Sequence, residues 1–443
     1  MHNTSERTEF GQAVRFPHTF LWGAAMSAHQ VEGENVHSDW WAWEQAGRVE
    51  DRSGLACDHY RRFREDFDLA KQLHHNAHRL STEWSRIEPE PGRWDEEAIA
   101  HCQEVIAALR EHHLEPIVTL FHFTSPKWFS DQGGWQQPNA IEQFGRYVER
   151  VIEALGPSVR YWITFNEPAS DVYQGYVAGV WPPGQRSWPA AFRVLERLLH
   201  AHTMAYHLVH ARLDSQGSAP LVGFAKHMVV FTPCNPHSRK DQLATWVRQS
   251  YFNGTIAESF GRGHLLPRLQ HLLRRSVHRR YLDFIGLNYY TRDFVHFKGW
   301  TWGKLFGEAC SLTHHPDAGV RNSLGWEMYP QGIYQCLKQL ARAGLPVLVT
   351  ENGICTNDDG QRAQFIHDHL AQIARAMNEG VPVLGDLHWS LLDNYEWHEG
   401  FAPRFGLVEV DYAAQERRVR PSARYLATVA KTGQLVRANG AVE

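Results

Sequence analysis

The stretch 345-LPVLVTENG-353 ends an apolar run abruptly in a carboxylate, an amide and a glycine. Five consecutive apolar residues, Leu345 to Val349, present no polar side to water, which predicts a strand buried on both faces. Glu351 follows at the carboxyl end of this strand. In barrels and open sheets of parallel strands, side chains at that end project into the mouth formed by the following loops. The stretch therefore predicts a parallel α/β fold with Glu351 at its functional edge.

A second stretch of the same kind, 159-VRYWITFNEP-168, lies far upstream and ends in Asn166, Glu167 and Pro168. Two strands that each end in a glutamate predict a pair of carboxylates that converge on one pocket. No nucleotide-binding or metal-binding motif accompanies them. The reaction that needs such a pair alone is glycoside hydrolysis.

A short apolar run followed by a longer helical pattern recurs eight times along the chain. Strands are predicted at 20–26, 77–82, 116–123, 161–166, 221–225, 284–290, 347–351 and 383–390. Helices are predicted at 59–73, 96–112, 139–155, 189–213, 241–259, 331–343, 360–379 and 421–431. Eight such units are the count of a (β/α)8 barrel. Because no linker or charge block interrupts the 443 residues, we expect a single catalytic barrel domain over 1–443, with its core at about 16–432 and long βα loops at the C-terminal face.

Composition narrows the classes of partner. The formal charge is −4, and Lys and Arg are neither in excess nor clustered, which argues against nucleic acid. The N-terminus lacks a basic segment followed by an apolar one, and no apolar run reaches membrane length, so we expect no membrane partner. The oligomeric state stays open.

The cysteines and histidines do not indicate a metal. None of the six cysteines approaches a C-x-x-C spacing, so neither a zinc site nor a redox pair is predicted for Cys57, Cys102, Cys234, Cys310, Cys336 or Cys355. We expect a reduced, cytoplasmic protein without a cofactor or metal. The segment 231-FTPCNPHSRK-240 reads as a proline-punctuated loop to which no chemistry can be assigned.

Three polar residues follow or occupy the early predicted strands. Gln30 comes directly after the first strand, where its amide could give and accept hydrogen bonds with sugar hydroxyls, although a lone loop glutamine is more often a bystander. Arg79 lies within a strand pattern and needs a carboxylate partner. We expect that partner to be Glu351, and a structural ion pair elsewhere is the alternative. His122 ends the third strand, where a satisfied core histidine is the alternative to a sugar ligand.

The last units are the richest in binding candidates. The sixth strand ends in Asn288 and Tyr290, whose phenol could donate to a nearby carboxylate. The segment 388-HWSLLDNYEWHEGFAPRFG-406 contains Trp389 at a strand end, followed by Glu396 and Trp397. An indole face packs on the C–H face of a pyranose, and a carboxylate beside it accepts paired hydroxyl hydrogen bonds. A sugar site is the better interpretation of this combination than core packing.

The chain resembles a known family. In order and spacing, six segments resemble glycoside hydrolase family 1, the β-glucosidase family: FLWGAAMSAHQVEG, RLSTEWSRIEP, WITFNEP, GLNYYTR, VTENG and HWSLLDNYEWHEGFAPRFGL. The resemblance runs from about Phe16 to Pro421 and implies a single (β/α)8 barrel. It also implies small-molecule β-glycosides as partners, with terminal β-D-glucosyl residues of β-glucosides and short β-linked oligosaccharides, as in cellulose degradation, as substrates.

The resemblance also implies a role for each site residue. Glu167 corresponds to the acid/base and Glu351 to the nucleophile. The ligands of the non-reducing sugar would be Gln30, His122, Asn166, Glu396 and Trp397, with Trp389 as the stacking platform. Arg79 and Tyr290 would hold the nucleophile, and Trp326 would form a wall on the leaving-group side. The implied mechanism retains anomeric configuration through a covalent glycosyl-enzyme, with some β-galactosidase, β-fucosidase and transglycosylation activity.

The sequence departs from the family pattern at three places. Phe123 stands where a tryptophan followed by an acidic residue is common, and Asp386 stands where an aromatic residue is usual. The segment 398-HEGFAPR-404 lacks the Ser and Lys pattern that resembles phosphate recognition, which favours an unphosphorylated sugar. These departures concern substrate preference rather than the reaction itself.

Three rival interpretations remain. A non-catalytic sugar-binding barrel would typically lack one carboxylate, whereas both are present. A metal-dependent hydrolase would need an H-E-x-x-H or similar spacing, which does not occur. A thioglucosidase is disfavoured because its family pattern has glutamine at the position of Glu167.

Overall fold

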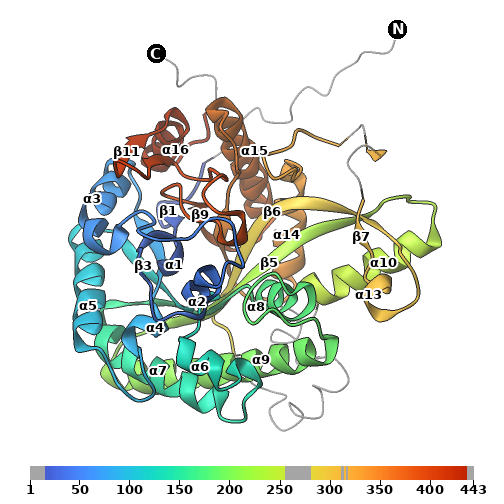
Figure 1. Ribbon diagram of the computed structural model, residues 1–443. Helices are drawn as coiled ribbons and strands as arrows, with labels where there is room; N and C mark the ends of the chain where they lie inside the picture. Colours follow the sequence, from blue (N-terminus) through green and yellow to red (C-terminus); the bar gives the residue numbers. More distant parts are fainter. Residues whose placement is uncertain (1–14, 255–280, 311–313, 316–317, 437–443) are drawn as a thin grey trace.

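The computed structural model describes residues 15–254, 281–310, 314–315 and 318–436, which include a closed barrel of eight parallel strands. Around the barrel, neighbouring strands lie in the order β5, β4, β3, β2, β1, β9, β8, β6, and a β5–β6 pairing closes the ring (Figure 1). The strands are β1 (Leu21–Ala25), β2 (Ala77–Ser81), β3 (Glu115–Phe121), β4 (Tyr161–Asn166), β5 (Leu221–Pro233), β6 (Ile285–His296), β8 (Val347–Asn352) and β9 (Val383–Trp389). This architecture confirms the predicted (β/α)8 barrel.

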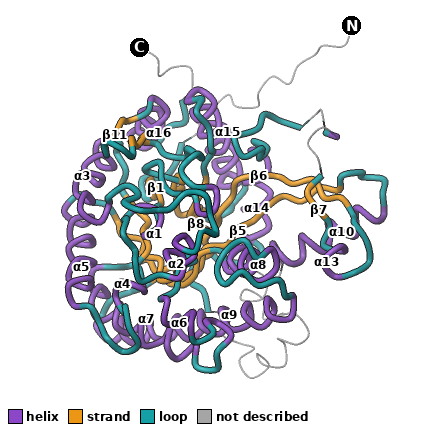
Figure 2. The backbone as a smooth tube through the Cα atoms, in the orientation of Figure 1, coloured by secondary structure: helices purple, strands orange, loops and turns teal. Residues whose placement is uncertain are grey.

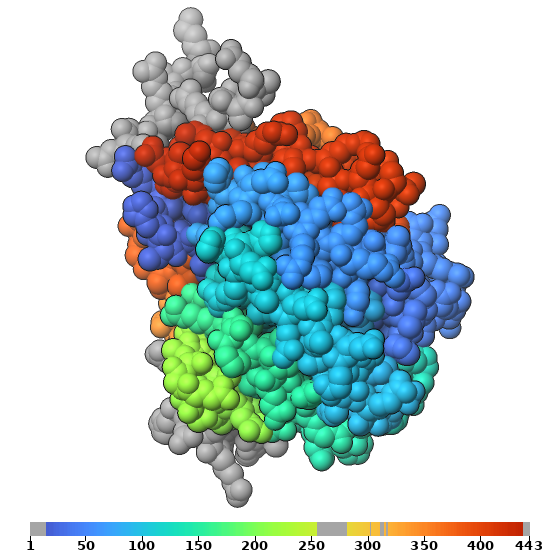
Figure 3. Space-filling model, turned by 90° about the vertical axis from the view of Figure 1, so that its left-hand side faces the viewer, coloured from blue at the N-terminus to red at the C-terminus, as the bar shows by residue number. Residues whose placement is uncertain are grey.

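Helices surround the barrel and alternate with its strands. The long ones are α3 (His59–Gln72), α5 (Glu96–Glu111), α7 (Ala140–Leu155), α9 (Trp188–Leu213), α10 (Arg239–Gln249), α14 (Pro330–Ala341), α15 (Asp359–Asn378) and α16 (Pro421–Thr432). The side chains of Asp95 and Asp358 cap the first turns of α5 and α15, as short polar residues favour at that position. Figure 3 shows the continuous outer surface on the side that carries α3, α5 and α7. Within the described residues, no helix is both long enough and apolar enough to span a bilayer.

Shorter elements sit mainly in the loops that connect strands to helices. They are α1 (Ala28–Val31), α2 (Asp39–Gln45), α4 (Trp84–Ile87), α6 (Lys127–Asp131), α8 (Pro168–Tyr173), α13 (Trp302–Leu305), β7 (Glu308–Ala309), β10 (Val408–Asp411) and β11 (Glu416–Val419). One helix prediction needs correction. The helix expected at 241–259 ends at Gln249 and gives way to a π-helical turn over Ser250–Gly254, and positions 255–259 lie outside the described residues.

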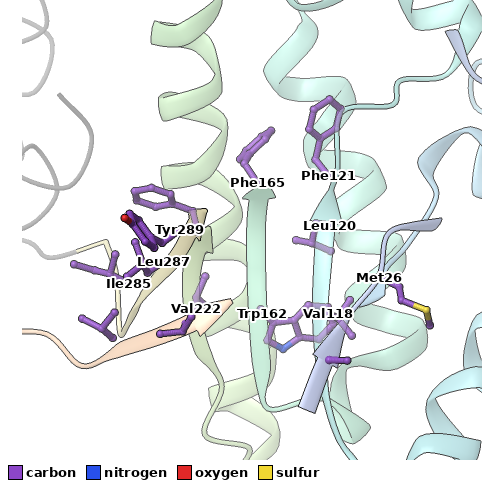
Figure 4. Packing of buried hydrophobic residues seen from close by; sticks show 14 of the residues in the cluster. Met26, Val118, Leu120, Phe121, Trp162, Phe165, Val222, Ile285, Leu287 and Tyr289 are labelled. Carbon is purple, nitrogen blue, oxygen red and sulfur yellow. The ribbon is translucent and has the colours of Figure 1, made fainter. Parts of the chain in front are cut away.

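Side-chain alternation along the strands creates two apolar layers. Leu348 belongs to the inner cluster, together with Ile117, Ile163 and Leu387, whereas its neighbours belong to the larger cluster between strands and helices. Figure 4 shows part of this outer layer, with Val118, Leu120, Trp162, Val222, Ile285, Leu287 and Tyr289. Each such aliphatic side chain contributes about 1.5 to 3 kcal/mol when fully buried. The predicted burial of this strand on both faces is confirmed.

Two strands extend well beyond their predicted ends. β5 and β6 were expected at 221–225 and 284–290, but they reach Pro233 and His296 and stay paired with each other as far as the Pro233–Val295 pair. We call residues 226–233 and 291–296 the β5–β6 arm. It projects past the barrel, and β7 pairs antiparallel with its β6 strand (Figure 2). The apolar run breaks at Lys226, so the sequence pattern concealed this continuation.

The two ends of the described barrel meet. The backbone N–H of Phe16 donates to the carbonyl of Gly433 at 2.8 Å, and Arg15 and Gln434 form an isolated antiparallel bridge. The C-terminal end of the last helix, α16, therefore lies beside the segment that leads into β1.

Candidate active site

A cavity of about 460 Å³ opens at the carboxyl ends of the barrel strands. Its lining combines carboxylates, amides and aromatic rings, including Gln30, His122, Asn166, Glu167, Tyr290, Trp326, Glu351, Trp389, Glu396 and Trp397. Concave sites of this size and composition at this face are typical of the substrate pockets of such barrels.

Glu351 lies near the end of β8, and its side chain is almost fully buried. Arg79 Nη1 donates to Glu351 Oε1 at 2.6 Å, and Tyr290 Oη donates to Glu351 Oε2 at 2.5 Å. A cation and a phenol therefore hold one oxygen each, which fixes the carboxylate in orientation. Arg79 is itself buried on β2, where its Nε donates to Thr119 at 3.0 Å. The predicted ion pair between Arg79 and Glu351 is confirmed.

Glu167 follows β4 and occupies the residue before helix α8. Its backbone adopts a left-handed conformation, with φ of 41°, and Pro168 begins the helix at the position that favours proline. This sharp turn directs the carboxyl into the cavity, and left-handed backbone at a residue with a side chain is typical of functional sites. Asn288 Nδ2 donates to Glu167 Oε1 at 2.7 Å, and His227 Nδ1 lies 3.5 Å from Glu167 Oε2.

A buried amide network joins the surroundings of the two glutamates. Arg79 Nη2 donates to Asn166 Oδ1 at 2.7 Å, and Asn288 Nδ2 approaches the same oxygen at 3.1 Å. Asn288 Oδ1 accepts from the Thr350 hydroxyl at 2.6 Å, directly before Glu351 in the chain. Through Asn166 and Asn288, the two carboxyls belong to one rigid polar layer above the apolar barrel interior.

Burial raises the pKa of three neighbouring carboxyls, and for two of them the charge of a nearby glutamate adds to the rise. Burial raises the pKa of Glu351 to about 7; Arg79 opposes this rise, and the charge of Glu167 adds to it. Burial also raises the pKa of Glu167 above its ordinary value, and the amide of Asn288 opposes this. Burial, with the charges of Glu351 and Glu167, raises the pKa of Glu396 to about 8. Of the three, Glu351 has both a guanidinium and a phenol bound to its oxygens, which favours its ionised form.

The opposite wall carries groups suited to a pyranose. Gln30 Nε2 donates to the Tyr395 carbonyl at 2.8 Å and lies 3.3 Å from Glu396 Oε2. His122 Nε2 and Asn166 Nδ2 are 3.0 Å apart. The His122 ring is stacked at about 6 Å from the indoles of Trp389 and Trp397. Amide, imidazole and carboxylate groups beside indole faces match the polar edge and apolar face of a sugar.

An aromatic wall lies on the side of Tyr290. The Trp326 ring centroid is 5.7 Å from that of Tyr290 and 6.2 Å from that of Phe405. The structure thus brings all the predicted site residues to the cavity except Arg79, which lies beneath it and acts through its contacts. Their joint placement is a finding, whereas the roles assigned to them remain predictions.

Sequence reasoning missed three residues of the site. Asn288 was noted only as a strand end, although the quoted segment GLNYYTR contains it. His227 lies on the unpredicted part of β5. Trp181 packs 4.9 Å from Phe123 and 5.7 Å from Trp397, and its indole N–H donates to His398 at 2.9 Å.

Two of the departures from the family pattern have clear positions. Phe123 lines the cavity beside Trp181 and Trp397, so an apolar ring occupies that edge of the pocket. Asp386 is buried on β9 and is not among the residues that line the cavity, and burial raises its pKa to about 7. Asp386 therefore does not contact a sugar bound in this cavity.

The prediction from cysteine spacing was wrong for one pair. Cys234 and Cys310 are 76 residues apart in sequence, yet their sulfur atoms lie within bonding distance of each other, with Cα atoms 6.1 Å apart. Spacing within short segments could not reveal a pair brought together by the β5–β6 arm. Cys57, Cys102, Cys336 and Cys355 are free.

Comparison with known proteins agrees with this geometry. The family profile described as Glycosyl hydrolase family 1 matches residues 12–435. With the barrel and the converging carboxyls, this shows that the chain belongs to glycosyl hydrolase family 1. It is therefore an enzyme, a β-glycosidase built on a TIM barrel.

Individual relatives match over nearly their whole length. Beta-glucosidase A of Thermotoga maritima is 31% identical, over 95% of this chain and 99% of its own. A beta-galactosidase of Pyrococcus woesei is 30% identical, over 91% of this chain and 94% of its own. Among solved structures, a beta-glycosidase from Pyrococcus horikoshii is 38% identical with a TM-score of 0.86, covering 96% of this chain and 97% of that one. The beta-glucosidase from Thermotoga maritima has also been solved in complex with castanospermine, with 31% identity and a TM-score of 0.86 over 96% of this chain and all of that one.

Proposed function

We propose that the protein is a retaining β-glucosidase that removes terminal non-reducing β-D-glucosyl residues through a covalent glycosyl-enzyme. The observation that carries this proposal is the unequal setting of the two glutamates. Glu351 has Arg79 and Tyr290 on its oxygens, which stabilises a carboxylate nucleophile. Glu167 has no guanidinium or phenol on its oxygens but an amide on one of them, and burial raises its pKa, which together suit a proton donor.

In the first step, Glu351 attacks the anomeric carbon while Glu167 protonates the departing glycosidic oxygen. A glycosyl ester forms on Glu351 and the alcohol leaves. The retaining geometry requires the two carboxyl groups to be about 5 to 5.5 Å apart. Asn166, held by Arg79, would donate to the sugar 2-hydroxyl, a contact that strengthens as positive charge develops on the ring.

In the second step, Glu167 acts as the base. Once the ester forms, the negative charge of Glu351 disappears, and the loss of a neighbouring negative charge favours the ionised form of Glu167. Glu167 then accepts a proton from water, which attacks the anomeric carbon and releases the sugar with its original configuration. An acceptor sugar in place of water would give transglycosylation.

A relative named beta-glucosidase supports glucose as the preferred sugar, and the cavity is compatible with its carbon-4 epimer. Gln30 and Glu396 lie side by side and can bind adjacent hydroxyls of either configuration at carbon 4. Relatives named beta-glucosidase and beta-galactosidase match at similar identity, which supports additional β-galactosidase and β-fucosidase activity. Glu396 and Glu399 both line the cavity, and their carboxyl groups offer a phosphate no cationic partner, which disfavours a phosphorylated sugar. Small β-glycosides, including short β-linked oligosaccharides, are therefore the proposed substrates.

Trapping the intermediate tests the proposal. An activated 2-deoxy-2-fluoro-β-glucoside should leave one glycosyl adduct on Glu351, found by intact mass and peptide mapping. Glu351→Gly should take up no label and should lose turnover. Glu327→Gln is the matched control, because Glu327 is equally buried but pairs with Arg292 outside the cavity.

The outcomes separate this function from its rival, a non-catalytic sugar-binding barrel. An adduct on another residue, or normal turnover by Glu351→Gly, contradicts the assignment of the nucleophile. Azide should restore turnover of an activated aryl glycoside by Glu167→Gly, and failure to do so contradicts the acid/base assignment. Tight glycoside binding with no hydrolysis of glucosides or galactosides would favour the binding barrel.

The proposal also covers the domain organisation and the cellular location of the protein. We propose that residues 16–432 form one catalytic domain, because Phe16 and Gly433 join its ends. A cytoplasmic location is supported by the four free cysteines, three of which are buried.

A further inference from the structure

A cluster of three soft ligands lies at the far end of the β5–β6 arm. Cys234 directly follows β5, Cys310 directly follows β7, and His314 comes four residues later. The two sulfur atoms and one ring nitrogen all lie within 4.8 Å of one another. Cys310 Sγ is 3.3 Å from His314 Nδ1. Among the described residues, this is the one group of histidine, cysteine or acidic side chains that meets this criterion.

Backbone hydrogen bonds place the two cysteines independently of any bond between their sulfurs. The N–H of Cys234 donates to the Val295 carbonyl at 2.8 Å, and the N–H of Cys310 donates to the Phe294 carbonyl at 2.6 Å. Both acceptors belong to β6, so consecutive carbonyls of this strand hold the two ligands in position. The chain therefore presents both thiol groups to the same point in space.

We propose that Cys234 and Cys310, as thiolates, and His314 bind one Zn²⁺ ion. Zinc prefers thiolate and imidazole ligands, and bonds of about 2.0 to 2.3 Å hold tetrahedral ligand atoms within about 4 Å of one another. The site forms in the reduced chain: a small thiol reductant supplies the two electrons and two protons that keep Cys234 and Cys310 as thiols, and their side chains then rotate apart around the ion. The exposed His314 side chain supplies the third ligand. Each ligand thiol loses its proton to solvent when the metal binds.

A zinc ion accounts for more of the cluster than a disulfide does. A disulfide uses the two sulfurs and gives the adjacent imidazole no role. The other four cysteines are free, as is usual where thiols stay reduced. Each cysteine also has a histidine close by in sequence, since His237 follows Cys234 by three positions and His314 follows Cys310 by four. The fourth position would be filled by water or by His237, which an Asx turn through Asn235 holds close to Cys234 along the chain.

The site would stabilise the outer wall of the substrate cavity. Ala309, next to Cys310, lines that cavity, as do Phe231 and Asp293 of the β5–β6 arm. The three proposed ligands are themselves absent from the cavity lining, so the ion would not meet the reacting atoms. Its role would be to tie β5 to the segment after β7, with an effect on thermal stability and on KM for longer substrates rather than on the chemical step.

Metal content and thiol chemistry test the site without reference to activity. The full chain, purified under reducing conditions and dialysed against trace Zn²⁺, should retain one zinc per chain by elemental analysis. Replacing zinc by Co²⁺ should produce thiolate-to-metal absorption. Cys234→Ser and Cys310→Ser should abolish both signals, and His314→Ala should weaken retention. Cys102→Ser is the matched control, because Cys102 is a free cysteine outside the cluster, and it should retain the metal.

The alternatives give distinct results. A disulfide would make the untreated chain two hydrogens lighter in intact mass and protect Cys234 and Cys310 from alkylation until reductant is added. That result, or a reduced chain that retains no metal, would overturn the proposal. Unchanged metal retention in either serine variant or in His314→Ala would equally overturn the assigned ligands. If the serine variants fold poorly, the mass and alkylation of the unaltered chain still decide the question.

Discussion

Replacing Tyr290 by phenylalanine would test how Glu351, the proposed nucleophile, is kept ionised. Tyr290 Oη donates to Glu351 Oε2 at 2.5 Å, and burial raises the pKa of Glu351 to about 7. A hydrogen bond to a charged group is worth about 1.5 to 3 kcal/mol. Because the phenol stabilises the ionised form, its removal should raise the pKa of Glu351 by about 1 to 2 units, at about 1.4 kcal/mol per unit.

The pH dependence of kcat/KM on an aryl β-glucoside would measure this shift. The acid limb of that profile reports groups of the free enzyme that must be ionised, and in this pocket it belongs to coupled carboxyls. For Tyr290→Phe, the acid limb should move to higher pH by about 1 to 2 units, and kcat/KM should fall less at pH values above that limb.

The adjacent tyrosine provides the control. Tyr289 lies on the outer face of the same strand and donates to the Tyr329 carbonyl at 2.7 Å, away from the cavity. Tyr289→Phe should leave the acid limb unmoved. An acid limb that stays in place in Tyr290→Phe, with kcat/KM lowered equally at every pH, would refute the claim that the phenol controls the ionisation of Glu351.

Three further predictions follow from single contacts. Both ring nitrogens of His78 are buried without a hydrogen-bond partner, and burial lowers its pKa to about 3. Below about pH 6.5 the unfolded chain therefore binds a proton that the folded chain does not. The unfolding free energy of His78→Phe minus that of the unaltered protein, measured by urea titration, should be about 2 kcal/mol higher at pH 5 than at pH 8. A Cβ at Gly353 would lie 1.9 Å from the Trp389 carbonyl oxygen, so Gly353→Ala should cost about 3 kcal/mol in the same assay. Asn288→Ala removes the donor to Glu167 and should lower kcat/KM about 10- to 100-fold while moving the basic limb to higher pH, because the amide had lowered the pKa of Glu167.

Each of these has a result that would contradict it. Equal stability changes of His78→Phe at pH 5 and pH 8 would show that the imidazole is not kept neutral by burial. Gly303→Ala is the glycine control, because a Cβ there would meet no atom closer than 3.6 Å, and it should not destabilise the protein. A basic limb unmoved in Asn288→Ala would mean that the amide does not act on the proton of Glu167.

The sequence predicted the barrel because its strands are local apolar runs. Leu348 is buried on the inner face of the barrel, and the residues before and after it are buried on the outer face. An apolar run of this kind can be recognised in the sequence without knowing which strands it pairs with. The two glutamates could be predicted for the same reason, since each ends one of these runs. The residues around the two glutamates could be predicted from the family resemblance but not from the periodicity of apolar residues.

What the sequence did not predict depends on contacts between distant segments. The continuation of β5 through Lys226 and His227 is stabilised by pairing with β6, a partner about sixty residues away, and its mixed composition has no strand periodicity. Asn288 is an ordinary amide at a strand end until β2 and β4 bring Arg79, Asn166 and Glu167 around it. The cluster of Cys234 and Cys310 likewise exists only because the β5–β6 arm folds as it does.

Because Phe16 contacts Gly433, the two ends of the barrel domain lie side by side. The folded barrel therefore does not depend on which strand comes first in the chain. A short peptide linker between these positions would make the backbone circular, and new termini could then be opened in an exposed turn such as the one at Gly217, where a Cβ would meet no atom within 4 Å. A circularly permuted chain of this kind would carry Glu351 ahead of Glu167 in the order of synthesis. The order in which the two glutamates emerge from the ribosome is thus a property of where the gene starts, and the pocket does not depend on it.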